Sequence, residues 1–511
     1  MENNSVNLPS VQWRIRKTVT SLTNPGHSYE NGEPHEGTAL LGNNHVGTNG
    51  FGSHHSHGGA WEFFFNAQHT PGTDNSKPWV KYPAHVWHIT KATLLSSPVN
   101  VLLVAVPIGI IAGQTGWDPV AVFTINFFAI IPLAAVLSFA TEEISAKLGE
   151  ALGGLLNATF GNAVELIVSI IALRDKQIEV VKSSMIGSIL SNLLLVMGMC
   201  FFFGGIVNMR DADGNAQEQS FQTITAQTTA SLMTLSAASM ILPGTLFMII
   251  NNSKSGDTAE RNSVILSLSR GTAIILLILY VLYLWFQLRT HHTLFSAESG
   301  PDPEQEHDEP ILPASDDFPE NTRRPVRQEH GEVVEEEVHM SPWSAGAVLI
   351  VTTVLVSICA DYLVESIDAL VERAHISRSF IGLILIPIVG NAAEHVTAVV
   401  VAVKNKMDLA LGVAIGSSIQ IALFVTPFLV VLGWIMDRDM DLHFETFETV
   451  SFALAVLVVI YTVQDGKSNY LEGAMLMALY IIIALAFFVT PSAYFDTDWV
   501  VGKLSSLISS T

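Results

Sequence analysis

The chain has 511 residues, of which 49% are hydrophobic and 14% charged, and its formal net charge is −22. A soluble domain usually carries about a quarter of charged residues, so this composition excludes an ordinary soluble enzyme and a disordered chain. It favours a protein with most of its length in lipid, and the acidic excess argues against nucleic acid as a partner. Cys200 and Cys359 lie in apolar stretches, which indicates packing roles rather than a disulfide or zinc site.

The polar segment 1–97 is rich in Gly, Asn, Ser and His, a composition typical of a disordered tail. Weak metal binding or regulation through its histidines is the alternative interpretation. Lys and Arg are moderately more frequent on the segments that would share a side with this tail. The positive-inside rule therefore predicts a cytosolic N-terminus.

Eleven apolar runs of bilayer-spanning length follow the tail. Lipid offers the backbone no hydrogen-bond partners, so each run must satisfy its own, and the length of the runs selects helices. We expect an all-α polytopic membrane protein with about eleven transmembrane helices and no sizeable soluble domain. The runs lie near residues 99–114, 119–139, 151–173, 183–204, 223–250, 268–288, 343–363, 379–402, 409–435, 447–463 and 470–490.

An acidic insert at 291–341 divides the first half, 98–290, from the second half, 342–490, and residues 491–511 form a C-terminal tail. Fourteen acidic residues and three arginines give the insert half of the net charge of the chain. Its end could form a short acidic helix that concentrates Ca²⁺ or regulates the protein, and a solvated cytosolic linker is the alternative. The acidic residues of this end are Glu332, Glu335, Glu336 and Glu337.

A motif occurs twice, and it is the strongest signal in the sequence. Residues 161–165 read GNAVE and residues 390–394 read GNAAE, and the tripeptide Ile-Gly-Ser follows at the same distance after each. The offset is 229 residues in every case. Five predicted spans separate the two copies, and an odd number reverses direction through the membrane. The sequence therefore predicts two inverted five-helix repeats plus one extra N-terminal helix, with a substrate site near the midplane.

Each motif places a glutamate, Glu165 or Glu394, deep inside a predicted span. A charge at this depth costs roughly 3 kcal/mol on insertion scales, which indicates a functional group facing the protein interior. A structural ion pair is the alternative, but neither span contains Lys or Arg. Helical spacing of three or four residues brings amide and hydroxyl oxygens onto the same faces.

Such oxygens suit a hard cation such as Ca²⁺, and the scarcity of Cys and His argues against zinc or copper. Burial and mutual repulsion would make the two carboxylates take up protons when the cation leaves, which predicts antiport of at least two protons per divalent cation. His395 either relays or tunes these protons or simply packs. The predicted cation ligands are Glu165, Glu394, Gly161, Asn162, Gly390, Asn391, Ser188, Ser417 and Gln420.

Two further acidic pairs occupy similar places in the two halves, just before the motif helices. They could form cation-attracting mouths on opposite membrane faces. Ordinary solvated helix ends are the alternative. The pairs are Glu142 with Glu143, and Asp361 with Glu365.

The segments GNAVELIVSIIAL, SMIGSILSNLLLV, GNAAEHV and GVAIGSSIQIALFVTPF resemble the paired alpha-repeats of the cation/proton exchanger family. These are vacuolar Ca²⁺/H⁺ antiporters of the Ca²⁺/cation antiporter superfamily, and the chain looks closest to fungal members. The resemblance covers roughly residues 99–490. It implies transport of cytosolic Ca²⁺ into the vacuole in exchange for protons, with Glu165 and Glu394 binding both. The long tail departs from the family pattern.

Other functions remain open at this point. They are a cation channel and an exchanger for another cation, such as Mn²⁺ or a sodium-coupled carrier. The sequence has no HExxH, GxSxG or P-loop motif, so we expect no enzymatic activity and no organic cofactor. The expected partners are Ca²⁺ and protons as substrates and the lipid bilayer, and the sequence leaves the oligomeric state open.

Overall fold

The computed structural model describes residues 70, 73, 77–148, 150–210, 214–252, 258–291 and 340–489. Contacts divide the chain into a unit that ends at Lys91 and a unit that begins at Ala92. Apart from α3 (Pro78–Leu95), the helices discussed below belong to the second unit. The predictions made for the C-terminal tail and for the four glutamates at the end of the insert lie outside the described residues, as does most of the N-terminal tail. The end of that tail, residues 77–97, is described and forms helix α3 instead of the predicted disorder.

The first half is helical except for one two-residue strand. Helix α3 (Pro78–Leu95) precedes it. Its elements are η1 (Pro98–Val104), α4 (Ala105–Gln114), α5 (Pro119–Leu148), α6 (Glu150–Phe160), α7 (Ala163–Arg174), α8 (Ile178–Leu190), η2 (Ser191–Val196), α9 (Met197–Val207), β1 (Gln219–Ser220), α10 (Thr223–Asn252), α11 (Thr258–Trp285) and η3 (Phe286–Thr290).

The second half has the same character, and its single strand pairs antiparallel with β1. Its elements are α13 (Pro342–Glu365), α14 (Ile367–Ala374), α15 (Arg378–Phe380), η5 (Ile381–Leu385), α16 (Ile386–Gly390), α17 (Ala392–Val403), α18 (Met407–Gln420), η6 (Ile421–Val425), α19 (Thr426–Ile435), α20 (Thr446–Thr462), β2 (Lys467–Ser468) and α21 (Tyr470–Val489).

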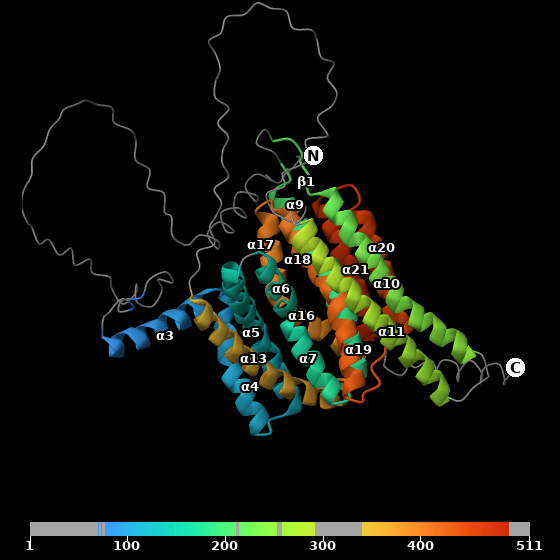
Figure 1. The fold of residues 1–511 in the computed structure, drawn as a ribbon, viewed down its shortest axis with the longest axis horizontal. Helices are drawn as coiled ribbons and strands as arrows, with labels where there is room; N and C mark the ends of the chain where they lie inside the picture. The colour runs from blue at the N-terminus through green and yellow to red at the C-terminus, as the bar shows by residue number, and fades with distance from the viewer. Residues whose placement is uncertain are drawn as a thin grey trace, which may run out of the picture. The chain divides into compact units, whose positions relative to one another are not determined.

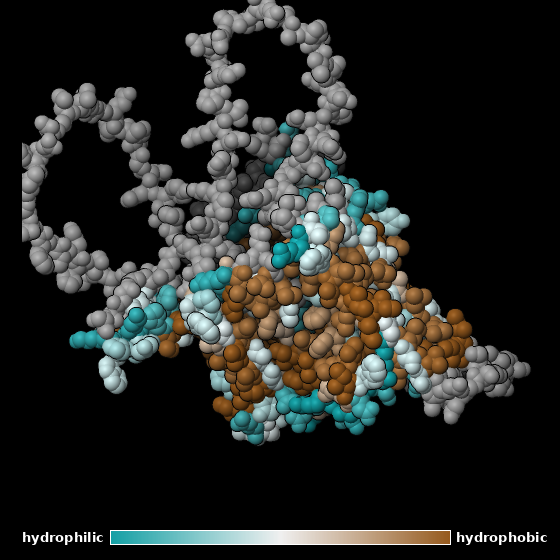
Figure 2. All heavy atoms as spheres, in the orientation of Figure 1, coloured by the Kyte–Doolittle hydropathy of each residue, from teal (hydrophilic) through white to brown (hydrophobic). Residues whose placement is uncertain are grey.

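The predicted all-α membrane architecture is confirmed. Among the described residues, seven helices are long and apolar enough to cross a membrane, or up to nine if each of two bent helix pairs counts as one span. Each of the eleven predicted runs contains a helix, but α17 and α20 are shorter than a full span. The count of eleven is therefore not confirmed. Figure 2 shows the hydrophobic side chains gathered along the flanks of the helices, and hydrophilic ones at their lower ends.

The 229-residue offset seen in the sequence reappears in the helix boundaries. Helices α7 and α17 begin and end at equivalent positions, and the chain is non-helical at the residue before each, Asn162 and Asn391. The next turn contains a left-handed residue in both copies, Lys176 and Asn405. The following helices, α8 and α18, both continue into a π-helical turn, η2 and η6, before the α-helix resumes.

The two repeats are inverted, as predicted. The turn with Lys176 precedes α8, whereas Asn208, at the end of α9, donates a hydrogen bond to the carbonyl of Val403, the last residue of α17 before the turn with Asn405. Segment 178–207 spans about 45 Å at 1.5 Å per residue, so equivalent turns lie at opposite ends of the same helical segment. In Figure 1, α7 lies below α6, whereas α17 lies above α16.

Two faces of the membrane unit are used below. The insert face contains β1 and β2, residues 207–210, 214–222 and 403–407, and the second end of the acidic insert, since Glu143 near the end of α5 accepts a hydrogen bond from the backbone N–H of Met340. The far face contains the turns at 174–177 and 436–445. Segments α8–α9 and α18–α19 are the most buried spans, which lets them carry polar side chains away from lipid.

Candidate cation-binding site

The two glutamates of the repeated motif occupy equivalent places at the breaks between helices. Glu165 and Glu394 lie in the first turns of α7 and α17, where backbone N–H groups lack helical partners and the helix dipole favours negative charge. Glu165 is only 4% exposed. A Cβ at Gly390 would lie 2.5 Å from Glu165 Oε1, so this glycine admits the carboxylate of the opposite repeat.

One oxygen of each glutamate is left without a protein partner. Oε2 of Glu165 and Oε2 of Glu394 are buried and make no hydrogen bond within the described part of the chain. Glu394 lies against Ser417 and Asn192, and it is close enough to Glu165 for direct electrostatic interaction. A buried carboxylate oxygen without a donor is costly, so both oxygens are positioned to hold a cation or a proton.

A hydrogen-bond network joins the repeats beside these carboxylates. The Asn162 amide donates to Gln420 Oε1 at 2.5 Å, and its oxygen accepts from Ser417 Oγ at 3.0 Å. Asn192 donates to Ser417 Oγ at 3.0 Å. The network therefore brings together three of the predicted ligands and one residue, Asn192, that the sequence analysis did not select. Its polar side chain within an apolar run was the available signal.

The equivalent amide of the second repeat is not used in this way. Asn391 is fully buried, and neither its Oδ1 nor its Nδ2 has a hydrogen-bond partner among the described residues. Asn162 and Asn391 match in sequence but differ in bonding. The free amide oxygen of Asn391 is available as a ligand.

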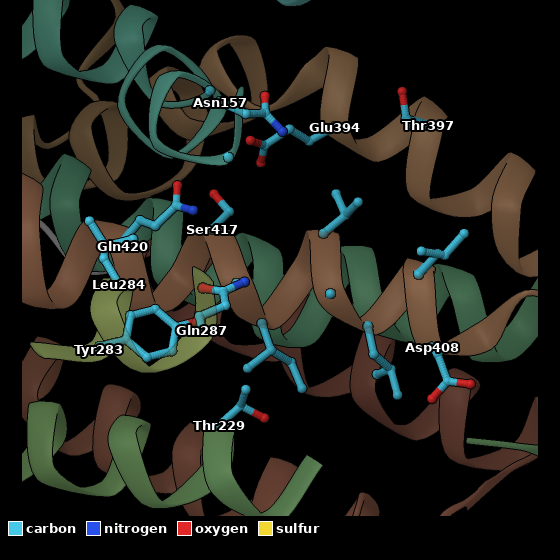
Figure 3. A pocket seen from close by; sticks show the side chains of 18 of the residues that line it. Asn157, Thr229, Tyr283, Leu284, Gln287, Glu394, Thr397, Asp408, Ser417 and Gln420 are labelled. Atoms are coloured by element: carbon cyan, nitrogen blue, oxygen red, sulfur yellow. The ribbon is translucent and has the colours of Figure 1, made fainter. Parts of the chain in front are cut away.

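A cavity of about 390 Å³ leads from Glu394 to the insert face. Glu394, Ser417 and Gln420 line its inner end, and the exposed residues Glu142 and Asp408 line its outer part. Figure 3 shows Asn157, Ser417 and Gln420 gathered around Glu394, with Asp408 and Thr229 farther along the cavity. The site is thus reachable from the insert face.

The far face is closed by close backbone packing. A Cβ on Gly187 of α8 would collide with the backbone of Leu383, and one on Gly382 would lie 2.7 Å from Ser183 Cβ. Pro387 leaves the Leu383 carbonyl without its usual helical donor. Freed carbonyls of broken helices serve as cation ligands in transporters, but this one packs against Gly187 instead.

The remaining predicted site residues fall into three environments. His395 forms a 3.2 Å hydrogen bond with Ser191, one turn after the buried Ser188 of α8. Gly161 begins the break between α6 and α7, and a Cβ there would be close only to the Asn157 carbonyl of α6. Of the acidic pairs, Glu142 lines the cavity and Glu143 anchors the chain at Met340, while Asp361 bonds to Arg174 and Glu365 is exposed.

The donor set consists of carboxylate, amide and hydroxyl oxygens. No group of three His, Cys, Asp or Glu side chains suited to a metal occurs in the described residues. Hard cations accept such mixed oxygen ligands, including amides and backbone carbonyls. Several cavity residues, such as Asp408 and Gln287, were not predicted; Asp408 stands 229 residues after Glu179, which the repeat could have revealed.

Fold and site together define a helical membrane protein with inverted repeats and an oxygen-lined site between them. The family model described as sodium/calcium exchanger protein matches residues 119–289 and 344–489. The chain belongs to this family.

Individual relatives agree with this assignment. A vacuolar calcium ion transporter of Schizosaccharomyces pombe is 46% identical over 79% of this chain and 87% of its own. Vacuolar cation/proton exchanger 3 of Arabidopsis thaliana is 39% identical over 78% of this chain and 80% of its own. The solved structure of native YfkE has a TM-score of 0.59 at 33% identity, and covers 77% of this chain and 100% of its own.

Proposed function

We propose that the chain is a vacuolar Ca²⁺/H⁺ antiporter that moves cytosolic Ca²⁺ into the vacuole in exchange for protons. The observation that carries the proposal is the pair Glu165 and Glu394, each with a buried carboxylate oxygen that makes no hydrogen bond within the described residues, and with Glu394 at the inner end of a cavity. The names of the relatives, vacuolar calcium ion transporter and vacuolar cation/proton exchanger, support it.

The mechanism follows from the burial of the two carboxylates. With Ca²⁺ bound, both are ionised and their charges balance the cation. When the cation leaves, burial and mutual repulsion favour uptake of protons, so that an empty site becomes neutral before it turns to the other side. The unpartnered Asn391 amide adds an oxygen ligand. His395, bonded to Ser191, tunes the adjacent Glu394 or relays its proton.

The orientation in the membrane is part of the proposal. A cytosolic N-terminus places the acidic insert, and the cavity on the same face, in the cytosol. The carrier then stands open to the compartment from which Ca²⁺ is taken. Glu142 and Asp408 at the mouth raise the local concentration of cations.

The test is proton-driven ⁴⁵Ca²⁺ uptake into sealed vacuolar vesicles that contain the full chain. Glu165→Gln and Glu394→Gln should each abolish uptake, because a neutral amide neither balances the cation nor exchanges a proton. Size-exclusion chromatography of each variant controls for folding. Robust uptake by either variant contradicts the mechanism, and uptake that ignores a protonophore but follows membrane potential indicates a channel. Competition by Mn²⁺ and by Na⁺ tests the other cation choices.

A further inference from the structure

A second group of buried ionisable side chains lies outside the cation site, where the far face is closed. It joins α8 of the first half to α15, α20 and the loop 436–445 of the second half. Glu448 is 1% exposed and accepts a hydrogen bond from Ser183, and Ser379 donates to Glu179 Oε1 at 3.2 Å. The contacts cross between the halves at the level where Gly382 packs on α8.

The charges of this group do not balance. Four carboxyl groups, those of Glu179, Asp441, Glu445 and Glu448, share one ammonium, Lys182. Lys182 is already engaged, since its Nζ donates to Asp441 at 2.5 Å and to the His443 carbonyl at 2.9 Å. Glu448 is buried, and Glu179 and Glu445 are half-buried beside it. Keeping all three ionised without further counter-charges is unfavourable. The closed arrangement is therefore stable only when part of the group is protonated.

The loop residue Glu445, just before α20, is a carboxyl group that lacks such compensation. Its Oε2 is buried and has no hydrogen-bond partner within the described residues. Burial, and then repulsion by Glu448 and Glu179, raises the pKa of Glu445 to about 8, against a smaller opposing effect of Lys182. His443, which faces Lys182 and Asp441, has its pKa lowered by burial and by Lys182, so its charged form is disfavoured there.

At the equivalent positions, the described part of the insert face carries fewer carboxyl groups. Glu179 corresponds to Asp408 at the 229-residue offset. A second sequence match pairs Phe-Gln-Thr-Ile-Thr at 221–225 with Phe-Glu-Thr-Phe-Glu at 444–448. In this match, Gln222 and Thr225 are equivalent to Glu445 and Glu448. One carboxyl on the insert face thus stands where the far face has three. Asp408 is exposed, lines the cavity, and accepts a hydrogen bond from the backbone N–H of Gln222 at 2.7 Å.

We propose that Glu445 and Glu448, packed beside Glu179, form a proton-operated gate, which lets the far face close when these two side chains bind protons and makes it open when they release them. The sign follows from linkage. A carboxyl group whose pKa is higher in the closed state favours closure at low pH, and this preference is lost as the pH rises through that pKa. Protons come from and return to the far compartment.

The role of the gate in the transport cycle rests on the proposed function, whereas its geometry does not. If the far face meets an acidic vacuole, acid there closes the far gate and returns the carrier to the insert-face-open state, ready for the next cation. The cation site and the gate then both respond to the same proton gradient, the first near the midplane and the second at the far face.

The test measures how readily the far face opens, as a function of pH. The full chain carries a reporter cysteine at Val180→Cys, which is 1% exposed in the closed state and next to Glu179. Glu165→Gln and Glu394→Gln are added so that the cation site cannot contribute to the pH dependence. The rate of reaction with a water-soluble maleimide is compared with that of the unfolded chain at each pH. Chain without the reporter, with only the buried Cys200 and Cys359, gives the background.

The normalised rate should rise between pH 6 and pH 9, by up to about tenfold per pH unit for each proton released. Adding Glu445→Gln together with Glu448→Gln should remove this dependence. If that double variant folds poorly, Glu445→Gln alone, at a partly exposed position, should reduce the dependence. Asp408→Asn is the matched control and should leave the dependence unchanged. A rate that is independent of pH in the parent, or equally dependent in the Gln variants, overturns the gate. Because this background lacks the transport carboxylates, either result leaves the proposed antiport to its own test.

Discussion

The two repeats share a sequence pattern but pack differently against their surroundings. In the second repeat, α18 lines the cavity, and a Cβ on Gly416 would meet nothing within 4 Å. In the first repeat, α8 presses on η5, and its equivalent Gly187 has no room for a Cβ. Equivalent helices therefore belong to an open insert face and a closed far face. The difference shows that near-symmetric halves can hold one asymmetric state, as alternating access requires.

Substitution of the two equivalent glycines should give the largest difference between the repeats. Gly187→Ala forces a methyl group against the Leu383 backbone, and overpacking of this kind costs about 1–3 kcal/mol. Gly416→Ala meets open space and should change the thermal unfolding temperature little. Thermal unfolding of both purified variants measures this. Equal destabilisation would contradict the open and closed assignment of the two faces.

The two motif asparagines should separate cation binding from stability. Asn391→Ala removes a buried amide that makes no bond within the described residues, so the fold should hold while the apparent Ca²⁺ affinity falls about tenfold, the equivalent of one ligand contact of about 1.4 kcal/mol. Asn162→Ala breaks bonds to Gln420 and Ser417 and should also lower the unfolding temperature. Calcium-dependent uptake and thermal unfolding measure the two effects. Unchanged affinity in Asn391→Ala would exclude it as a ligand.

The smallest effect is expected at the exposed ion pairs of the far face. Arg174 is 52% exposed and pairs with Asp361, and such surface pairs contribute about 0–1 kcal/mol. Arg174→Gln should shift the unfolding temperature only slightly, and less at high salt. Arg373→Gln, which breaks the exposed pair with Asp118, is the matched control. A large loss of stability in either variant would show that the far face is held by its surface rather than by its buried packing.

Much of the architecture could be predicted from the sequence because it depends on local patterns. Apolar runs predict helices in lipid, and the ungapped offset between the two GNA-x-E motifs predicts the inverted repeat. The helix breaks at Asn162 and Asn391 and the meeting of Glu165 with the opposite repeat agree with that expectation. Short or broken helices such as α17 made the number of spans harder to predict, because hydropathy does not register a break.

The sequence by itself determined the helical membrane class, the two-fold repeat and the pair of glutamates, because each follows from hydrophobicity or from residue identity at fixed spacing. Tertiary structure alone decided which face is open, which asparagine is bonded, and which acidic residues lie together. Glu179, Glu445 and Glu448 are 269 residues apart at their extremes in the sequence. They become one buried group only because α8 and α20 pack against each other across the two halves. The free energy of burying their charges is a property of that packing, and no local pattern encodes it.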